Sequence, residues 1–190
     1  MKKKILVVLG GNSKERAVSL DSGKACVKAI KKIGYKVKKF DPKFHSYSEI
    51  KRKRVDVIFN ALHGKEGEDG KAQSFFEYLK IPYTHSGVLS SMNAMDKVIS
   101  KKIFKKNNLL SPKYFTIDKL KFNETKLKKK FFENKIKLPI VVKPSDEGSS
   151  IGVKVCNNFL KLNNETKKLF RIYNTLIFEE FIGGQEIQVA

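Results

Sequence analysis

Short runs of apolar, β-branched residues separated by helix-like segments constrain the first half of this chain most strongly. The runs cover residues 4–9, 35–40 and 55–60. Residues 18–33 lie between the first two runs and have apolar side chains at helical spacing, with Gly34 as a stop. A second helix is predicted over residues 72–79 and a short strand over residues 81–84. This β-α-β-β-α-β order predicts an α/β fold with a doubly wound parallel sheet.

The second half of the chain has a different pattern and predicts a separate α+β unit. A long helix is predicted over residues 90–107, and it contains the Asp96-Lys97 pair. The other expected elements are strands at 140–143, 152–156 and 176–179 and helices at 123–137 and 164–173. We therefore predict two domains, residues 1–95 and residues 96–190.

The formal net charge of +21 raises the question of a polyanionic partner. The excess is nearly all lysine, spread over most predicted helices, as is typical of solvated faces. Arginine, which reads guanine edges with paired hydrogen bonds, occurs only at Arg16, Arg52, Arg54 and Arg171. A specific nucleic-acid site is therefore disfavoured, although a basic polyanion-binding protein stays as one alternative.

The sequence shows neither a membrane span nor an export signal. No run of about 18 uncharged apolar residues occurs. The basic start and apolar run of residues 2–9 end at Gly10-Gly11, which is too early for a signal peptide. Cys26 and Cys156 lack metal-ligand spacing and are expected to be buried free thiols in a cytoplasmic protein.

Two glycine-containing strings follow predicted strands of the first domain. Residues 10–20 read GGNSKERAVSL and residues 63–74 read HGKEGEDGKAQS. Taken alone, Asn12 and Glu15 could form a capping box, Asp69 could cap a helix, and His63 could be a core histidine. A glycine-rich loop at the carboxyl end of a parallel strand also suits close approach of the backbone to a ligand.

Three strings in the second domain carry charged groups, and in isolation the last of them could be a surface turn with solvated glutamates. Lys97 follows Asp96 on the predicted helix, where a lysine alone would be read as solvent-facing. Lys143 ends an apolar strand and precedes the loop that contains Ser149 and Ser150, whose backbone could cradle phosphates although it is not a Walker A loop. Residues 176–186 combine a strand, two glycines and several carboxylates.

These five strings, in this order, resemble the D-alanine–D-alanine ligases of the ATP-grasp family over essentially the whole chain. Residues 63–74 match the signature H-G-x-x-G-E-D-G-x-A-Q-small at every defined position. Residues 10–23 are similar to G-G-x-S-x-E-R-x-V-S-L-x-S-G, and residues 142–152 to V-K-P-x-x-x-G-S-S-x-G. The resemblance implies a pre-ATP-grasp domain followed by an ATP-grasp subdomain whose C-terminal part is missing.

For the reacting substrate, the resemblance implies that Glu15 binds the ammonium of the first D-alanine and that His63 positions its acyl group. Ser149 would bridge Glu15 to a later loop. For the nucleotide, it implies that Lys97 and Lys143 contact ATP phosphates and that Ser149 and Ser150 close over them.

The adenosine contacts implied by the resemblance lie after the last predicted strand. Glu179 would accept the adenine amino group, and Phe181 and Ile182 would supply the hinge backbone and apolar contact. Glu186 would bind the ribose hydroxyls. Glu180 stands where relatives often have lysine, which weakens one expected polar contact.

The implied reaction joins two D-alanines through an acyl phosphate, with ATP and Mg²⁺ or Mn²⁺. A homodimer through the N-terminal domain is also implied. The resemblance also implies that the metal ligands lie downstream of residues 187–190, where the chain ends apparently within a strand. We therefore expect no useful ligase activity from these residues alone. A non-catalytic ATP-binding module and another ATP-grasp ligase are alternatives, but the second gives no reason for Glu15 and His63 to match.

Overall fold

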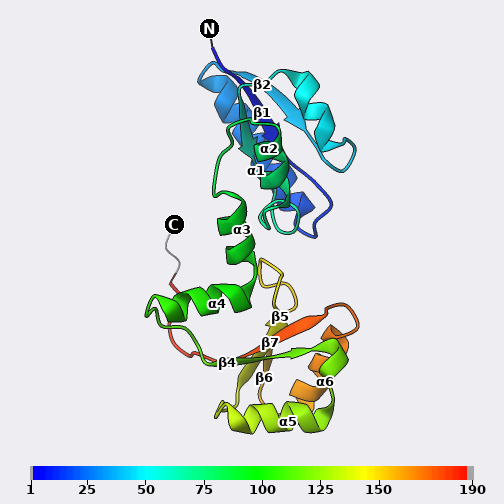
Figure 1. Cartoon of the computed structure of the whole chain (residues 1–190), viewed down its shortest axis with the longest axis vertical. Helices are drawn as coiled ribbons and strands as arrows, with labels where there is room; N and C mark the ends of the chain where they lie inside the picture. The colour runs from blue at the N-terminus through cyan, green and yellow to red at the C-terminus, as the bar shows by residue number, and fades with distance from the viewer. Residues whose placement is uncertain (1, 188–190) are drawn as a thin grey trace. The chain divides into compact units, whose positions relative to one another are not determined.

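The computed structural model describes residues 2–187. The chain divides into two compact units, residues 1–95 and residues 96–190 (Figure 1). The strand expected at the end of the chain involves residues 188–190, which lie outside the described residues. Among the residues described, no helix is long and apolar enough to cross a membrane.

The first unit is built on a parallel sheet, as predicted, although the sheet has three strands where four were expected. Its strands are β1 (Lys4–Val8), β2 (Lys36–Phe40) and β3 (Val57–Asn60), in the order β2-β1-β3. The central position of β1 agrees with its sequence, because Leu6, Val7 and Val8 are all fully buried. A strand covered on both faces needs apolar residues at consecutive positions.

Helices cover both faces of this sheet. On one face, α1 (Arg16–Lys32) packs Val27 and Ile30 against Val7 of β1. On the other face, the 3₁₀ helix η1 (Tyr47–Lys53) and α2 (Lys71–Tyr78) pack against Leu6 and Val8. The helix α3 (Val88–Met95) follows and contacts α2.

The second unit contains a four-stranded antiparallel sheet in the order β4-β7-β5-β6. The strands are β4 (Tyr114–Asp118), β5 (Ile140–Pro144), β6 (Lys154–Cys156) and β7 (Thr175–Glu180). The helices are α4 (Lys97–Lys106), the 3₁₀ helix η2 (Lys119–Lys121), α5 (Glu124–Glu133) and α6 (Phe159–Leu169).

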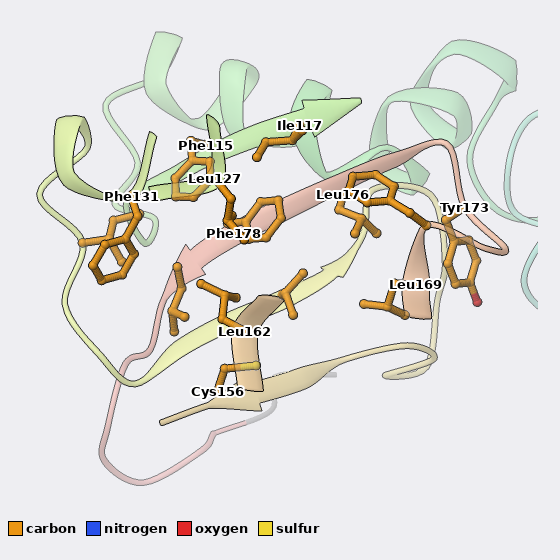
Figure 2. Packing of buried hydrophobic residues seen from close by; sticks show 14 residues of the cluster. Phe115, Ile117, Leu127, Phe131, Cys156, Leu162, Leu169, Tyr173, Leu176 and Phe178 are labelled. Atoms are coloured by element: carbon orange, nitrogen blue, oxygen red, sulfur yellow. The ribbon is translucent and has the colours of Figure 1, made fainter. Parts of the chain in front are cut away.

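The two faces of this sheet differ in chemistry. Figure 2 shows the apolar face, where Phe178 and Leu176 of β7 pack with Leu127 of α5 and Leu162 of α6. Because side chains alternate along a strand, Ile177 and Glu179 project from the opposite face. The register pairs Lys143 with Ile177, so Lys143 shares that opposite face with Glu179. The apolar face makes the core and leaves the other face for polar groups.

Several element boundaries differ from the predictions, and two of the differences change the number or type of elements. The helix predicted over residues 90–107 is broken at Asp96, whose backbone is extended and whose carboxylate accepts hydrogen bonds from Val98 N and Ile99 N. An aspartate in this geometry caps and starts a new helix. The strand predicted over residues 81–84 is reduced to a single parallel bridge between Ile58 and Tyr83.

The core of the second unit allows a matched test within one helix. Leu162 and Leu160 both lie on α6, but Leu162 is fully buried and Leu160 is 72% exposed. We expect Leu162→Ala to lower the free energy of unfolding by about 3 kcal/mol, through lost transfer energy and a cavity. Guanidinium unfolding followed by far-UV circular dichroism measures the change. Leu160→Ala is the control, and equal effects for the two variants would contradict this packing.

Candidate functional site

The candidate substrate site of the first unit lies where β1 and β3 end. The structure brings Glu15 and His63 together there, because Ser13 Oγ donates a hydrogen bond of 2.7 Å to His63 O. Gly64 has a φ of +69°, and a Cβ at this position would collide with the carboxylate of Glu15. Glycine suits this left-handed backbone, and a larger residue would also push the Glu15 carboxylate out of its place.

The imidazole of His63 is held between a hydroxyl and a carboxylate. Its Nε2 lies 3.0 Å from Ser22 Oγ, and its Nδ1 lies 3.6 Å from Glu68 Oε1. Glu68 is oriented in turn by Gly64 N, which donates to Oε2 at 2.8 Å. The side chain of His63 is about one-third exposed, at 34%, so the structure does not support the reading of His63 as a core histidine.

Buried polar groups fix the two loops that carry Glu15 and His63. Ser19 Oγ accepts from Gly10 N at 2.8 Å and donates to Ala61 O at 2.6 Å, which joins the ends of β1 and β3. In the second loop, Asn60 Nδ2 and Gln73 Nε2 both donate to Gly67 O. Both amide groups thus hold the same backbone oxygen from within the protein and fix the course of the second loop.

An ion pair that the sequence did not reveal supports the first loop. Arg16 makes hydrogen bonds of 3.1 and 2.8 Å to the two oxygens of Asp41 and donates to Gly11 O at 2.8 Å. Burial raises the pKa of Asp41, but the hydrogen bonds from Arg16, Gly11 N and Lys43 N outweigh it and leave the pKa below its usual value. The position of Asp41 directly after β2 was the only available signal.

Helix starts in this unit differ from the expected caps. Glu15 occupies the N-cap position of α1 without a side-chain cap, and Ser13 Oγ instead accepts from Glu15 N. The N-cap of α2 is Gly70, whereas Asp69 accepts a hydrogen bond from Lys71 N. The carboxylate of Glu15 is therefore not used for capping.

The candidate nucleotide site of the second unit contains Lys97 and Lys143. The Nζ of Lys97 donates to Glu147 O, and its backbone N donates to Ser145 O at 2.9 Å, so α4 is tied to the loop after β5. Burial lowers the pKa of Lys97 and the nearby Lys143 ammonium lowers it further, against smaller opposing effects of Asp146, Glu179 and Glu147.

Glu179 is a buried carboxylate between two ammonium groups. Its Oε2 lies 2.5 Å from Lys143 Nζ, and its Oε1 lies 3.1 Å from Lys101 Nζ. Lys101 also donates to Pro112 O at 2.9 Å. Lys101 had no predicted role, because sequence alone does not show that its position on α4 is buried.

The glycine- and serine-containing loop follows β5 directly. Ser149 and Ser150 are exposed and both have left-handed backbones, with φ of 46° and 59°. Gly152 has a φ of 74°, and a Cβ there would collide with Pro144. Consecutive residues of this kind make tight turns that can present N–H groups to an anion.

The remaining predicted nucleotide residues lie beyond β7 and are exposed. Phe181 and Ile182 are 43% and 63% exposed, and Glu186 is also exposed. The structure thus groups Lys97, Lys143 and Glu179 and leaves these three at the surface. Within residues 2–187, no group of three or more His, Cys, Asp or Glu side chains could hold a metal ion.

Comparisons with known proteins agree in both halves of the chain. A family model described as D-ala D-ala ligase N-terminus matches residues 37–86, and one described as D-ala D-ala ligase C-terminus matches residues 103–190. A D-alanine--D-alanine ligase of Pelagibacter ubique is 51% identical over 100% of this chain and 61% of its own length. One of Carboxydothermus hydrogenoformans is 40% identical over 98% of this chain and 60% of its own length.

Solved structures show the same similarity. The D-alanine--D-alanine ligase of Bacillus anthracis superposes with a TM-score of 0.83 and 33% identity, covering 96% of this chain and 58% of that chain. The same enzyme complexed with ATP gives a TM-score of 0.81 and 32% identity over 96% of this chain and 60% of that chain. The chain therefore spans less than two thirds of the length of these relatives.

Proposed function

Because the chain belongs to the D-alanine–D-alanine ligase family, we propose that it forms the first-substrate and nucleotide-binding parts of an enzyme that makes D-alanyl-D-alanine for peptidoglycan precursors. The observation that carries the proposal is the grouping of Lys97 and Lys143 beside the loop of Ser149 and Ser150. Two ammonium groups next to such a loop suit a polyphosphate. A relative's structure complexed with ATP supports the same choice of ligand.

The proposed reaction has two steps. A carboxylate oxygen of the first D-alanine attacks the γ-phosphorus of ATP, and ADP leaves. The amine of the second D-alanine then attacks the acyl phosphate, and phosphate leaves from the tetrahedral intermediate. Most of the rate enhancement in such transfers comes from positioning and charge neutralisation.

The surroundings of Glu15 and His63 suit the roles proposed for them. Glu15 is half-buried and not engaged as a helix cap, so its carboxylate can pair with the ammonium of the first D-alanine. His63 can position the acyl group, because Ser22 and Glu68 fix its ring. Ser149 would link Glu15 to a later loop.

For the nucleotide, Lys97 and Lys143 would neutralise phosphates and Ser150 would close over them with Ser149. Glu179 would face the adenine amino group, and Glu186 would bind the ribose hydroxyls. Phe181 and Ile182 would contact the adenine ring, and their exposure leaves their apolar surface available to it.

We propose that Mg²⁺ or Mn²⁺ accompanies ATP and offsets phosphate charge. The described residues do not by themselves make a site for this ion, since they contain no group of three potential ligands. The ligands of the ion would be ATP oxygens and groups supplied by the part of the relatives that this chain does not match.

The proposal also places the protein in the cytoplasm, where Cys26 and Cys156 would stay as free thiols. A homodimer through the first unit is part of the same proposal. Exposed apolar side chains on the described helices of that unit, Phe75, Tyr78, Leu89 and Met92, are consistent with it.

Calorimetric titration of the 190-residue chain with ATP tests the proposal. We expect saturable binding to one site, which Lys143→Met weakens by about tenfold or more because a charge-assisted hydrogen bond to phosphate is lost. Lys129→Met removes an equal charge from an exposed position on α5 and serves as the control. Equal weakening by both variants, abolished by salt, would indicate a polyanion-binding surface instead.

The lowered pKa of Lys97 gives the same titration a second readout. Because the pKa of Lys97 lies below its usual value of 10.5, the side chain is partly neutral at alkaline pH when no ligand is bound. Phosphate favours the ammonium form, so ATP binding is expected to take up a proton there, and affinity is expected to fall as pH rises. Titrations in buffers of different ionisation enthalpy measure the uptake, which Lys97→Met should remove. Unchanged uptake in this variant would contradict a phosphate contact.

A further inference from the structure

Lys101 is a buried cation behind the proposed phosphate-binding lysines. Its side chain is 7% exposed, although lysine is almost never buried without a partner. It projects from α4, and its Nζ lies 3.1 Å from Glu179 Oε1, 2.9 Å from Pro112 O and 5.0 Å from the ring centroid of Tyr114. Because its side chain has so little access to solvent, Lys101 is poorly placed to contact a ligand itself.

Two ammonium groups pair with the single carboxylate of Glu179, although one would neutralise its charge. Its side chain is 8% exposed and is shared between Lys101 and Lys143. The two lysines differ in access to solvent, because the side chain of Lys143 is 21% exposed and that of Lys101 only 7%. Of the two, Lys143 is therefore the ammonium that can turn toward a ligand.

Lys101 determines whether Glu179 still has a cationic partner when Lys143 moves from it to a ligand. A buried carboxylate that loses its only cation pays a large desolvation cost. If Lys143 were the single partner of Glu179, its transfer to a phosphate would leave Glu179 uncompensated. With Lys101 in place, Glu179 stays paired and Lys143 is free to move.

We propose that Lys101 is a positioning residue for nucleotide binding, which remains on Glu179 as a resident counter-ion and so releases Lys143 to a phosphate of ATP. This inference rests on the proposed ATP site and names a residue on which its affinity depends. It also explains why a lysine, not an apolar residue, occupies a buried position of α4.

Replacement of Lys101 tests the proposal by comparing ATP with adenosine, which lacks phosphates. We expect Lys101→Met to weaken ATP binding by about ten- to hundredfold, as for loss of a charge-assisted hydrogen bond, with adenosine affinity changed by less than about twofold. Lys101→Gln, which keeps a donor for Pro112 O, is the second variant in case the first does not fold. Equal weakening of both ligands would indicate a packing role and overturn the proposal, as would unchanged ATP affinity.

In a variant that lacks Lys101, removal of the negative charge of Glu179 should restore ATP binding. In Lys101→Met/Glu179→Gln, the carboxylate that holds Lys143 is removed, while the amide oxygen of glutamine can still accept a hydrogen bond from the adenine amino group. We expect its ATP affinity to return to within about threefold of that of Glu179→Gln alone. A double variant as weak as Lys101→Met would contradict the release of Lys143.

A ligand-free measurement separates failure of this inference from failure of the proposed function. Trace acetylation followed by peptide mass spectrometry reports how available the Lys143 amine is. We expect Lys101→Met to slow labelling of Lys143 severalfold relative to exposed Lys129, because Lys143 then stays on Glu179. Unchanged labelling overturns the role of Lys101 whether or not the chain binds ATP. Slowed labelling without ATP binding would refute the ATP site alone.

Discussion

In an enzyme completed with the downstream part of a relative, Glu15→Gln is expected to lower kcat/KM for D-alanine by about 10²-fold. The replacement keeps the shape of the side chain and its place beside Gly64, but it removes the charge that would pair with the substrate ammonium. Charge-assisted hydrogen bonds are about twice as strong as neutral ones, and a misplaced substrate alone can lose 10²-fold in rate. The remaining part of the Pelagibacter ubique ligase, 51% identical in the shared region, would complete the enzyme.

Quantification of D-alanyl-D-alanine by mass spectrometry during the reaction measures this effect. Asp21→Asn is the matched control, because Asp21 lies on α1 with its side chain 82% exposed and loses the same charge. We expect the control to stay within about twofold and ATP affinity to be unchanged in both variants. Comparable losses for Glu15→Gln and Asp21→Asn would show that Glu15 acts only through the charge of the surface.

The sheet of the first unit could be predicted because burial leaves a strong signal in sequence. Leu6, Val7 and Val8 are consecutive and fully buried, which only a central strand between two helical layers requires. The reduced strand at residues 81–84 shows the limit of that signal. Its residues have strand-like composition, but only Tyr83 pairs, and with Ile58 alone.

Helix boundaries depended on side chains whose capping role is visible only in three dimensions. Apolar periodicity continues across Asp96, so sequence alone predicted one helix where the Asp96 carboxylate starts a second. In the same way, α6 begins at Phe159, not near residue 164, because Asn158 caps it through Lys161 N. Asparagine and aspartate are common in loops and caps alike, which makes either reading reasonable from sequence.

The residues of the candidate site were easier to predict from sequence than their arrangement in space. Lys143 and Glu179 were found from their strings, but their shared face follows from the register that pairs Val141 with Glu179. Pairing between strands far apart in the chain is not encoded locally. Lys101 was missed for the same reason, since only the fold shows that this helix position faces a carboxylate.

The buried carboxylate of Glu179 is expected to contribute to the stability of the second unit even when no ligand is bound. We expect Glu179→Leu to destabilise the second unit by about 3–5 kcal/mol. The variant leaves Lys101 buried beside Pro112 O and the ring of Tyr114 but without its carboxylate, whereas Lys143 can turn to solvent. Hydrogen exchange of peptides from β7, measured by mass spectrometry, reports this unit directly.

Two comparisons separate the charge effect from a general cost of substitution. Glu180→Leu changes the neighbouring, only partly buried glutamate and is expected to cost less than about 1 kcal/mol. Lys101→Met/Glu179→Leu replaces the buried pair by apolar side chains and should recover most of the loss, because such replacements are often neutral or stabilising. Lys101→Met alone should cost less than Glu179→Leu, since Glu179 keeps Lys143 as a partner. If the double variant were less stable than Glu179→Leu, packing around Lys101 and not charge would determine the stability of this face of the sheet.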